Sequence, residues 1–299
     1  MDRQRYWIQD KFFGGAKVLR REFEGVFGMA DLAKPARFVW DFWSIQGQYK
    51  HLRAQPESVF SADSLANFYA HLEKWGLKNL GCSQVSPVWL SAYTEGCFQK
   101  LHADFPHGPW AFVYSLTPEE FKGAGRTMLA KDSLVDLWAS FDSLENFHEA
   151  DFFEYISPDF NRLVVFDPRL PHAVERVENA LGVLEGRLVL HGWFLPPQPV
   201  IQGELSEKTF GDALSKGLGD CQEAFISYPK LHGLLSFEFV VSRAGRVTRL
   251  KILSNTLINR ADPTESLSPL IELVTEKISG MTFKSQKEPS KCVLPLVFE

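Results

Sequence analysis

The stretch YTEGCFQKLHAD, residues 93–104, decides the fold, because it ends in a histidine and a carboxylate two positions apart. Alternate side chains of a β-strand leave the same face, so His102 and Asp104 are expected to point toward one site. A third group comes from LPHAVERV, residues 170–177, where His172 begins another β-type run. Two imidazoles and one carboxylate leave positions open on an octahedral ion, which is typical of a non-haem Fe(II) centre.

An arginine supports this interpretation of the three residues. Arg187 lies in RLVLHGWF, residues 187–194. In a strand its side chain shares one face with those of Val189, His191 and Trp193. A buried cation without a partner is very unfavourable, so an inward arginine is expected to meet a carboxylate. A small dicarboxylic acid can supply it through two parallel hydrogen bonds.

The flanking sequence predicts the elements around this site. Between Pro87 and Phe194, short β-type runs are separated by Gly, Pro and charged turns, as in a β-sandwich or barrel. Residues 57–80 have apolar side chains at helical spacing, with Ser61 or Asp63 as the cap. Four aromatic residues of the β-runs are candidates for the wall of a cavity, although aromatic residues in such runs are more often plain core: Trp110, Phe112, Tyr114 and Trp193.

Four segments together resemble the prolyl-4-hydroxylase-like branch of the 2-oxoglutarate/Fe(II) oxygenases. They are YTEGCFQKLHAD, FKGAGRTML, NRLVVFDPRLPHAVERV and EGRLVLHGWF, within residues 80–195. The resemblance implies a mainly β fold with flanking helices, a double-stranded β-helix or jelly roll. It also implies that the two histidines and Asp104 are the catalytic metal ligands and that Arg187 binds the distal carboxylate of 2-oxoglutarate.

The same resemblance assigns further cosubstrate contacts. It implies that Tyr93 helps to hold the oxo-acid. Some branches carry a serine where this chain has Val189, so Tyr93, Thr127 or a water is expected to complete the carboxylate site. The implied reaction uses Fe(II), 2-oxoglutarate and O2 to hydroxylate an unactivated C–H bond of a protein, peptide or amino acid, with release of succinate and CO2.

The three prolines of LPPQPV, residues 195–200, predict a boundary between a domain at 1–198 and a second at 203–299. The second is expected to contain a helix over 208–227, a hairpin with its turn at Ser242–Gly245, a helix over 265–279 and a last strand. Residues 215–299 resemble the TonB carboxy-terminal domain, a small α+β fold. This implies a recognition or self-association module, with a purely structural cap as an equal alternative.

Composition limits the other classes of protein. The net charge of −5 without a basic stripe argues against a nucleic-acid partner. Four cysteines without C-x-x-C spacing indicate free thiols in a reducing compartment. The sequence has no apolar run of about 18 residues, which predicts a cytoplasmic protein without a membrane partner.

Alternatives to the enzyme stay open at this point. One is an inactive metal-binding barrel that serves as a sensor or interaction scaffold, and another is a cupin-type enzyme, although cupins use a denser histidine cluster. The sequence also leaves the roles of His107 and His191 open: each is either a group of the site or an ordinary polar or packed side chain. Asp167 and Arg169 are expected to shape the turn before His172.

Overall fold

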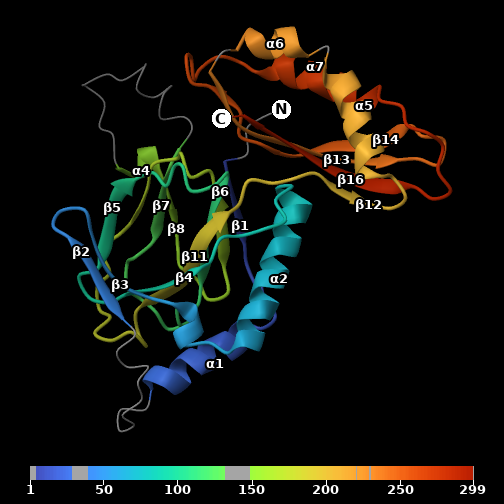
Figure 1. The fold of residues 1–299 in the computed structure, drawn as a ribbon. Helices are drawn as coiled ribbons and strands as arrows, with labels where there is room; N and C mark the ends of the chain where they lie inside the picture. Colours follow the sequence, from blue (N-terminus) through green and yellow to red (C-terminus); the bar gives the residue numbers. More distant parts are fainter. Residues whose placement is uncertain (1–4, 29–39, 132–148, 220, 229, 299) are drawn as a thin grey trace. The chain divides into compact units, whose positions relative to one another are not determined.

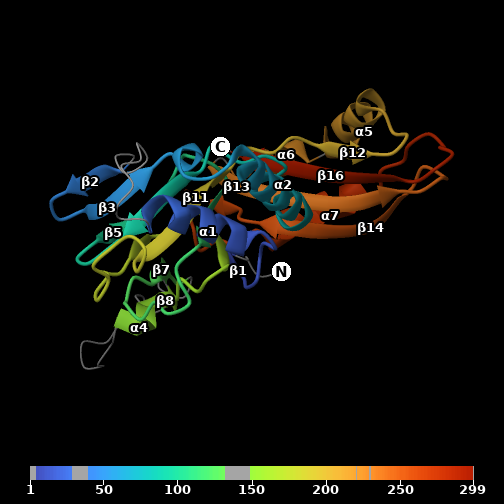
Figure 2. The same cartoon turned by 90° about the horizontal axis from the view of Figure 1, so that it is seen from below.

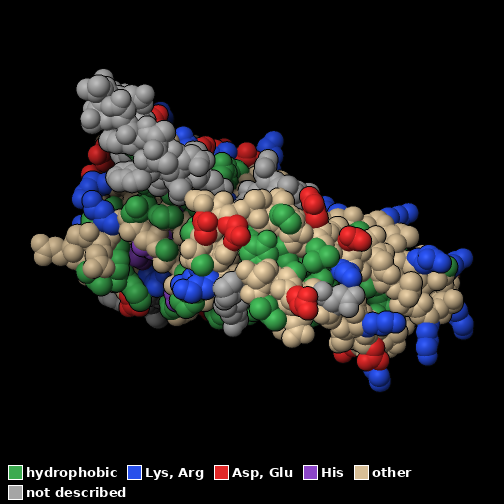
Figure 3. Space-filling model, turned by 90° about the horizontal axis from the view of Figure 1, so that it is seen from above, with side chains coloured by type: hydrophobic (Ala, Val, Ile, Leu, Met, Phe, Trp, Pro, Cys, Tyr) green, Lys and Arg blue, Asp and Glu red, His purple; other side chains and the backbone are tan. Residues whose placement is uncertain are grey.

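The computed structural model describes residues 5–28, 40–131, 149–219, 221–228 and 230–298. The chain forms two compact units: 6–71 with 85–194, and 1–5 with 72–84 and 195–299. Acidic and basic side chains both occur on the face drawn in Figure 3, with hydrophobic side chains between them. The chain has 32 basic and 37 acidic residues in all, and these charges nearly cancel to a small net charge.

The larger unit is built on one antiparallel sheet of eleven strands (Figure 1). In sheet order they are β1 (Tyr6–Gln9), β9 (Leu163–Phe166), β6 (Trp110–Ser115), β11 (Arg187–Phe194), β4 (Trp89–Tyr93), β3 (Tyr49–Ala54), β5 (Phe98–His102), β10 (His172–Val174), β7 (Thr127–Ala130) and β8 (Phe153–Ile156), and β2 (Asp41–Ile45) pairs with β3. The sheet curls on itself, so that one pocket is lined from β11 and β4 as well as from β5 and β10. The predicted jelly roll is confirmed.

Two helices, α1 (Ala16–Phe27) and α2 (Ala62–Asn79), lie outside the curl (Figures 1 and 2). The ring of Phe68 on α2 lies 4.9 Å from that of Tyr114 on β6, and Ser64 Oγ donates to Glu22 on α1. The predicted helix over 57–80 is shorter, because residues 56–58 form a 3-10 turn, η2 (Pro56–Ser58). Ser61 caps α2 as predicted, since its Oγ accepts from the backbone N–H of Ser64 at 3.3 Å. A short helix, α4 (Glu149–Phe152), precedes β8.

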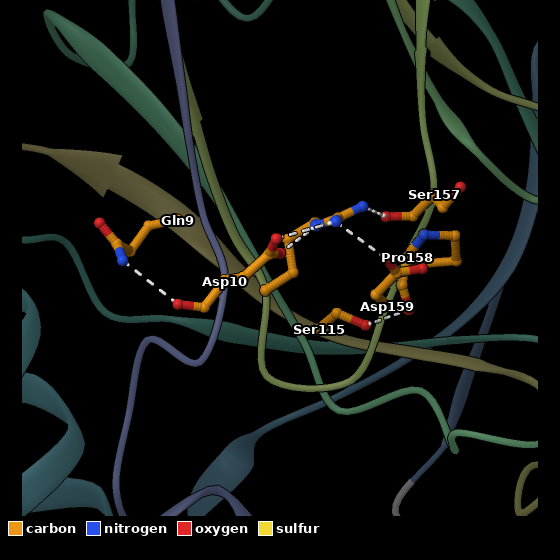
Figure 4. A network of polar contacts seen from close by, with 7 residues as sticks. Gln9, Asp10, Ser115, Ser157, Pro158 and Asp159 are labelled. Carbon is orange, nitrogen blue, oxygen red and sulfur yellow. Dashed lines mark hydrogen bonds and ion pairs between the residues drawn. The ribbon is translucent and has the colours of Figure 1, made fainter.

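A polar network connects the first strand to the turn before β9 (Figure 4). Arg162 Nε donates to Asp10 at 2.6 Å, its Nη1 donates to the carbonyl of Ser157 at 3.1 Å, and Asp159 pairs with Nη2 at 2.8 Å. The hydrogen bond from Arg162 lowers the pKa of Asp10. Asp10 is largely exposed, so the network sets the position of the β1–β9 edge more than it stabilises the fold.

The smaller unit is an α+β fold, as predicted for the second domain. Its sheet has the order β12 (Val200–Gln202), β16 (Ser290–Phe298), β13 (Leu231–Val241), β14 (Val247–Asn255), with β15 (Ile258–Asn259) on β13. The helices are α5 (Glu207–Gly219), α6 (Gln222–Ile226) and α7 (Ser268–Ser279). The single helix predicted over 208–227 is thus two helices, since glycine at 217 and 219 weakens the helix end.

All four cysteines are buried, and none is part of a disulfide. Cys82, Cys221 and Cys292 belong to the smaller unit and Cys97 to the larger. Burial raises the pKa of Cys292 to about 12, and it also raises the pKa of Cys82. Within the described residues, no helix combines the length and apolar character that a membrane crossing requires.

The domain limits 1–198 and 203–299 remain a prediction. Residues 72–84 suggest a test, because they belong to the same compact unit as 195–299. Leu72 and Leu80 are fully buried and belong to the same unit as 195–299, and Ser254 Oγ donates to the carbonyl of Leu80 at 2.9 Å. We expect a chain ending at Gln198 to fold and bind 2-oxoglutarate with lower stability, because each leucine that becomes exposed costs about 2 kcal/mol. Urea unfolding and anaerobic calorimetry measure both properties. An insoluble truncated chain, or one without affinity for 2-oxoglutarate, would contradict the boundary.

Candidate metal and oxo-acid site

The structure brings His102, Asp104 and His172 together in one pocket. His102 ends β5, His172 begins β10, and the two residues are paired across the strands. Asp104 lies beyond the end of β5, so its position comes from the chain after the strand and the expected strand alternation was wrong. Its carboxylate lies 3.5 Å from His102 Nε2 and 3.6 Å from His172 Nε2. The three ligand atoms all lie within 4.8 Å of one another.

Backbone carbonyls orient both imidazoles for metal binding. His102 Nδ1 donates to Lys100 O at 2.8 Å, and His172 Nδ1 donates to Leu170 O at 2.9 Å. A carbonyl can only accept, so each neutral ring carries its proton on Nδ1 and its lone pair on Nε2, facing Asp104. The amide nitrogen of Gln99 donates to His102 Nε2 at 2.9 Å, as this tautomer requires. The donor set therefore fits a divalent transition metal.

The charges of the three residues are coupled. Burial alone would raise the pKa of Asp104, but His102 and His172 outweigh it and hold that pKa well below its usual range. Burial would lower the pKa of His102, yet Asp104 and the Lys100 carbonyl raise it. Any proton held on an Nε2 must leave when a metal binds there, which makes metal affinity depend on pH.

The turn before His172 is built as expected from Asp167 and Arg169. The Asp167 carboxylate is buried and accepts from the backbone N–H of Arg169 at 3.0 Å and from its Nε at 2.9 Å. A carboxylate that binds both groups of one residue closes the turn locally. It fixes the direction in which the chain enters β10 and therefore the position of His172.

Arg187 is a buried cation with unused donors. It is 1% exposed, its Nη2 donates to Thr127 Oγ1 at 3.1 Å, and its Nε has no hydrogen-bond partner among the described residues. Its guanidinium lies 4.8 Å from the ring of Tyr93. Burial lowers the pKa of Arg187, while Tyr93 raises it. Buried donors are normally satisfied, so these observations fit a carboxylate ligand.

One pocket of about 470 Å³ contains the three ligands and Arg187. Its lining also includes Tyr93, Thr127, His107 and His191. Phe112 and Trp193 line it as well, whereas Trp110 and Tyr114 are fully buried core residues and not part of the wall. Of the four candidates, two therefore line the cavity and two are plain core.

The two histidines whose roles the sequence left open both face this pocket. His191 Nε2 bonds Ser91 Oγ at 2.8 Å, and burial lowers the pKa of His191 to about 3, so its ring is neutral. The ring of His107 packs against that of Trp193, with 4.6 Å between the ring centroids. Neither residue belongs to the cluster of three metal-ligand candidates.

The pocket residues that the sequence analysis missed include Gln99, His51 and Arg53. Gln99 links the two halves of the site, because it accepts from the Tyr93 hydroxyl at 3.2 Å while it donates to His102. His51 and Arg53 reach the pocket from β3. Their alternate spacing in YKHLRA was the available signal, but no motif marks it.

A protein-family model matches the part of the chain that contains this site. Residues 88–195 match the family model described as the 2OG-Fe(II) oxygenase superfamily. The match gives this region the cofactor and cosubstrates of that superfamily, which are Fe(II), 2-oxoglutarate and O2. No curated protein matches the chain.

Several solved structures are similar to about two thirds of the chain. A prolyl-4-hydroxylase from Pseudomonas putida is 17% identical, with a TM-score of 0.44, and 64% of this chain and 92% of that chain are covered. A prolyl hydroxylase from Trichoplax adhaerens, in complex with a peptide of hypoxia inducible factor, is 14% identical, with a TM-score of 0.43 and coverage of 64% and 83%. The viral collagen prolyl hydroxylase of Paramecium Bursaria Chlorella virus-1 is 13% identical, with a TM-score of 0.41 and coverage of 64% and 95%.

The contact between Thr127 and Arg187 predicts a measurable role for the hydroxyl group. Thr127→Val removes the oxygen that orients Nη2 and is expected to weaken 2-oxoglutarate binding by about tenfold, the value of one hydrogen bond to a charged group. Thr127→Ser keeps the oxygen and should restore most of the affinity. Anaerobic calorimetric titration checks both variants. If the valine and serine variants bind equally well, the hydroxyl group does not orient Arg187.

Proposed function

We propose that this chain is a Fe(II)- and 2-oxoglutarate-dependent hydroxylase that acts on an unactivated C–H bond of a protein, peptide or amino acid. The observation that carries the proposal is the convergence of three metal-ligand atoms within 4.8 Å in a pocket that also holds a buried arginine with an unpaired Nε. Fe(II) together with 2-oxoglutarate supplies the oxidising chemistry when bound.

Each residue of the metal and oxo-acid site has one task in the proposed enzyme. His102, Asp104 and His172 hold the metal. Arg187, oriented by Thr127 and Tyr93, receives the distal carboxylate of 2-oxoglutarate through its free N–H groups. The apolar side chains of Val189, Phe112 and Trp193 limit water around the reacting groups.

We further propose that residues 203–299 act as a recognition or self-association module, in a protein located in the cytoplasm. The similarity of residues 215–299 to the TonB carboxy-terminal domain motivates the idea of a module. The smaller unit has a buried core of its own, with Phe237, Phe239 and Val274 fully enclosed. The four buried thiols agree with a reducing compartment.

The test is turnover of the whole chain with Fe(II), 2-oxoglutarate and O2 in the presence of amino acids and peptides. The expected result is succinate formation that needs Fe(II), with a product heavier than its substrate by one oxygen atom. A peptide library and a mixture of free amino acids separate the two kinds of substrate. Lack of succinate under every condition would contradict the proposed function.

A further inference from the structure

One face of the sheet carries two polar side chains that the metal and the oxo-acid do not use. His51 and Arg53 alternate on β3 and share the pocket face with Trp43 on β2 and Trp89 on β4. Since β3 lies between β2 and β4, the two tryptophans flank this pair from opposite sides.

Arg53 packs against two tryptophan rings, one on each neighbouring strand. Its central carbon lies 4.5 Å from the ring of Trp43 and 4.5 Å from the ring of Trp89. The buried Nε of Arg53 has no hydrogen-bond partner among the described residues. Stacked rings leave the edge of a guanidinium free, and that edge carries all its N–H donors. Arg53 therefore lines the pocket with a guanidinium that the two rings hold in place.

His51 is likewise packed against an aromatic ring and has unpartnered polar atoms among the described residues. It is only 5% exposed, its ring stacks on Tyr93 at 5.1 Å, and both its nitrogens lack a partner among the described residues. Buried polar atoms are almost always hydrogen-bonded. Two neighbouring side chains that leave their donors unused on one pocket wall therefore indicate a ligand with acceptor oxygens.

The charges of the pocket specify the ligand further. Asp104 is the one acid among the described residues that line the pocket, and it belongs to the metal cluster. In the proposed enzyme, the charges of Fe(II), Asp104, Arg187 and the two carboxylates of 2-oxoglutarate cancel. The charge of Arg53 then remains without a counter-charge inside the pocket, which costs free energy unless an anion joins it.

We propose that the primary substrate enters this pocket with a carboxylate group, which Arg53 and His51 bind while Trp43 and Trp89 hold the guanidinium in place. The inference rests on the proposed function and specifies its substrate class: a free amino acid, a peptide with its terminal carboxylate, or another monocarboxylate. The planar edge of Arg53 suits the two oxygens of a carboxylate. A carboxamide of the same shape carries no charge and is expected to bind less well.

The test compares carboxylates with their own carboxamides. The probes are N-acetyl amino acids with small, branched, aromatic and cyclic side chains, each titrated calorimetrically beside its amide into the whole chain with Fe(II) and 2-oxoglutarate under anaerobic conditions. At least one carboxylate is expected to bind tighter than its amide by about tenfold or more, the range for a hydrogen bond to a charged group. Arg53→Gln should bring this ratio close to one, and Arg53→Lys should restore part of it.

The control is Arg176→Gln. Arg176 also stacks on an aromatic ring, that of Phe98 at 4.9 Å, but it does not line this pocket, so the ratio should persist in that variant. The ratio separates ligand binding from a structural role, because loss of a stacked arginine alone weakens acid and amide alike.

Three outcomes would overturn the proposal: no carboxylate is preferred over its amide, the preference survives in Arg53→Gln, or Arg53→Gln loses 2-oxoglutarate affinity, which would assign Arg53 to the cosubstrate. Succinate formation by the wild-type chain is measured on the same preparations. Its absence contradicts the proposed function, whereas the acid-to-amide ratio decides the subsite.

Discussion

An Asp104→Ala protein is expected to lose Fe(II)-dependent turnover of 2-oxoglutarate while keeping its fold. Asp104 faces both histidines and is the one carboxylate of the cluster. Even residues that only orient a metal ligand change affinity or activity by about ten- to a hundredfold, so removal of a ligand should exceed about a hundredfold. Succinate release and Fe(II) binding measure the loss, and circular dichroism measures the fold.

Asp212→Ala is the matched control for this experiment. Asp212 is an exposed carboxylate on α5 whose partner is Lys208, in the smaller unit, and its loss should leave turnover unchanged. If Asp104→Ala turns over 2-oxoglutarate at the wild-type rate, the metal does not bind at this cluster. An unfolded Asp104→Ala protein is judged instead with Asp104→Asn, which keeps the shape of the side chain but removes its charge.

Arg187→Leu is expected to raise the dissociation constant of 2-oxoglutarate by about thirtyfold or more, because removing one partner of a buried, hydrogen-bonded charge pair costs about 2–5 kcal/mol. Fe(II) affinity should change little, since Arg187 is not one of the clustered ligands. The protein should stay folded, because leucine replaces a buried cation that donates a hydrogen bond to Thr127.

Arg187→Lys provides the comparison for this substitution. Lysine keeps the charge but not the planar pair of donors, so its affinity for 2-oxoglutarate should lie between those of the wild type and the leucine variant. Anaerobic calorimetry with 2-oxoglutarate, and with Fe(II) alone, checks both variants. Equal affinity for 2-oxoglutarate in Arg187→Leu and the wild type would show that another residue binds the distal carboxylate.

The sequence was sufficient for those parts of the fold and site that depend on short patterns. The runs around His172 and Arg187 have strong β-type alternation, and both became strands of the jelly roll. The hairpin at Ser242–Gly245 likewise followed from a local turn signal, with β13 and β14 on either side. Such features are decided within about ten residues, which is the range over which strand patterns act.

Other features depend on partners distant in the sequence and were not predictable. The meaning of Arg53 comes from its register between β2 and β4, because only that pairing places Trp43 and Trp89 beside it. Strand alternation did not give the position of Asp104 either, since β5 ends at His102 and Asp104 lies in the chain beyond it. The last turns of α2 belong with a unit that begins again at residue 195, and no local pattern reveals such a division of one helix.

Each of the two units contains at least one buried cysteine, whose alkylation can report the opening of that unit. A thiol enclosed in the native core reacts with an alkylating reagent only while its surroundings are open, so the rate of modification measures opening events rather than surface chemistry. Cys97 reports on the larger unit, whereas Cys82, Cys221 and Cys292 report on the smaller one. Mass spectrometry of partly alkylated protein therefore distinguishes independent from concerted opening: independent units yield chains modified at Cys97 alone or at the other three alone, and concerted opening modifies all four together.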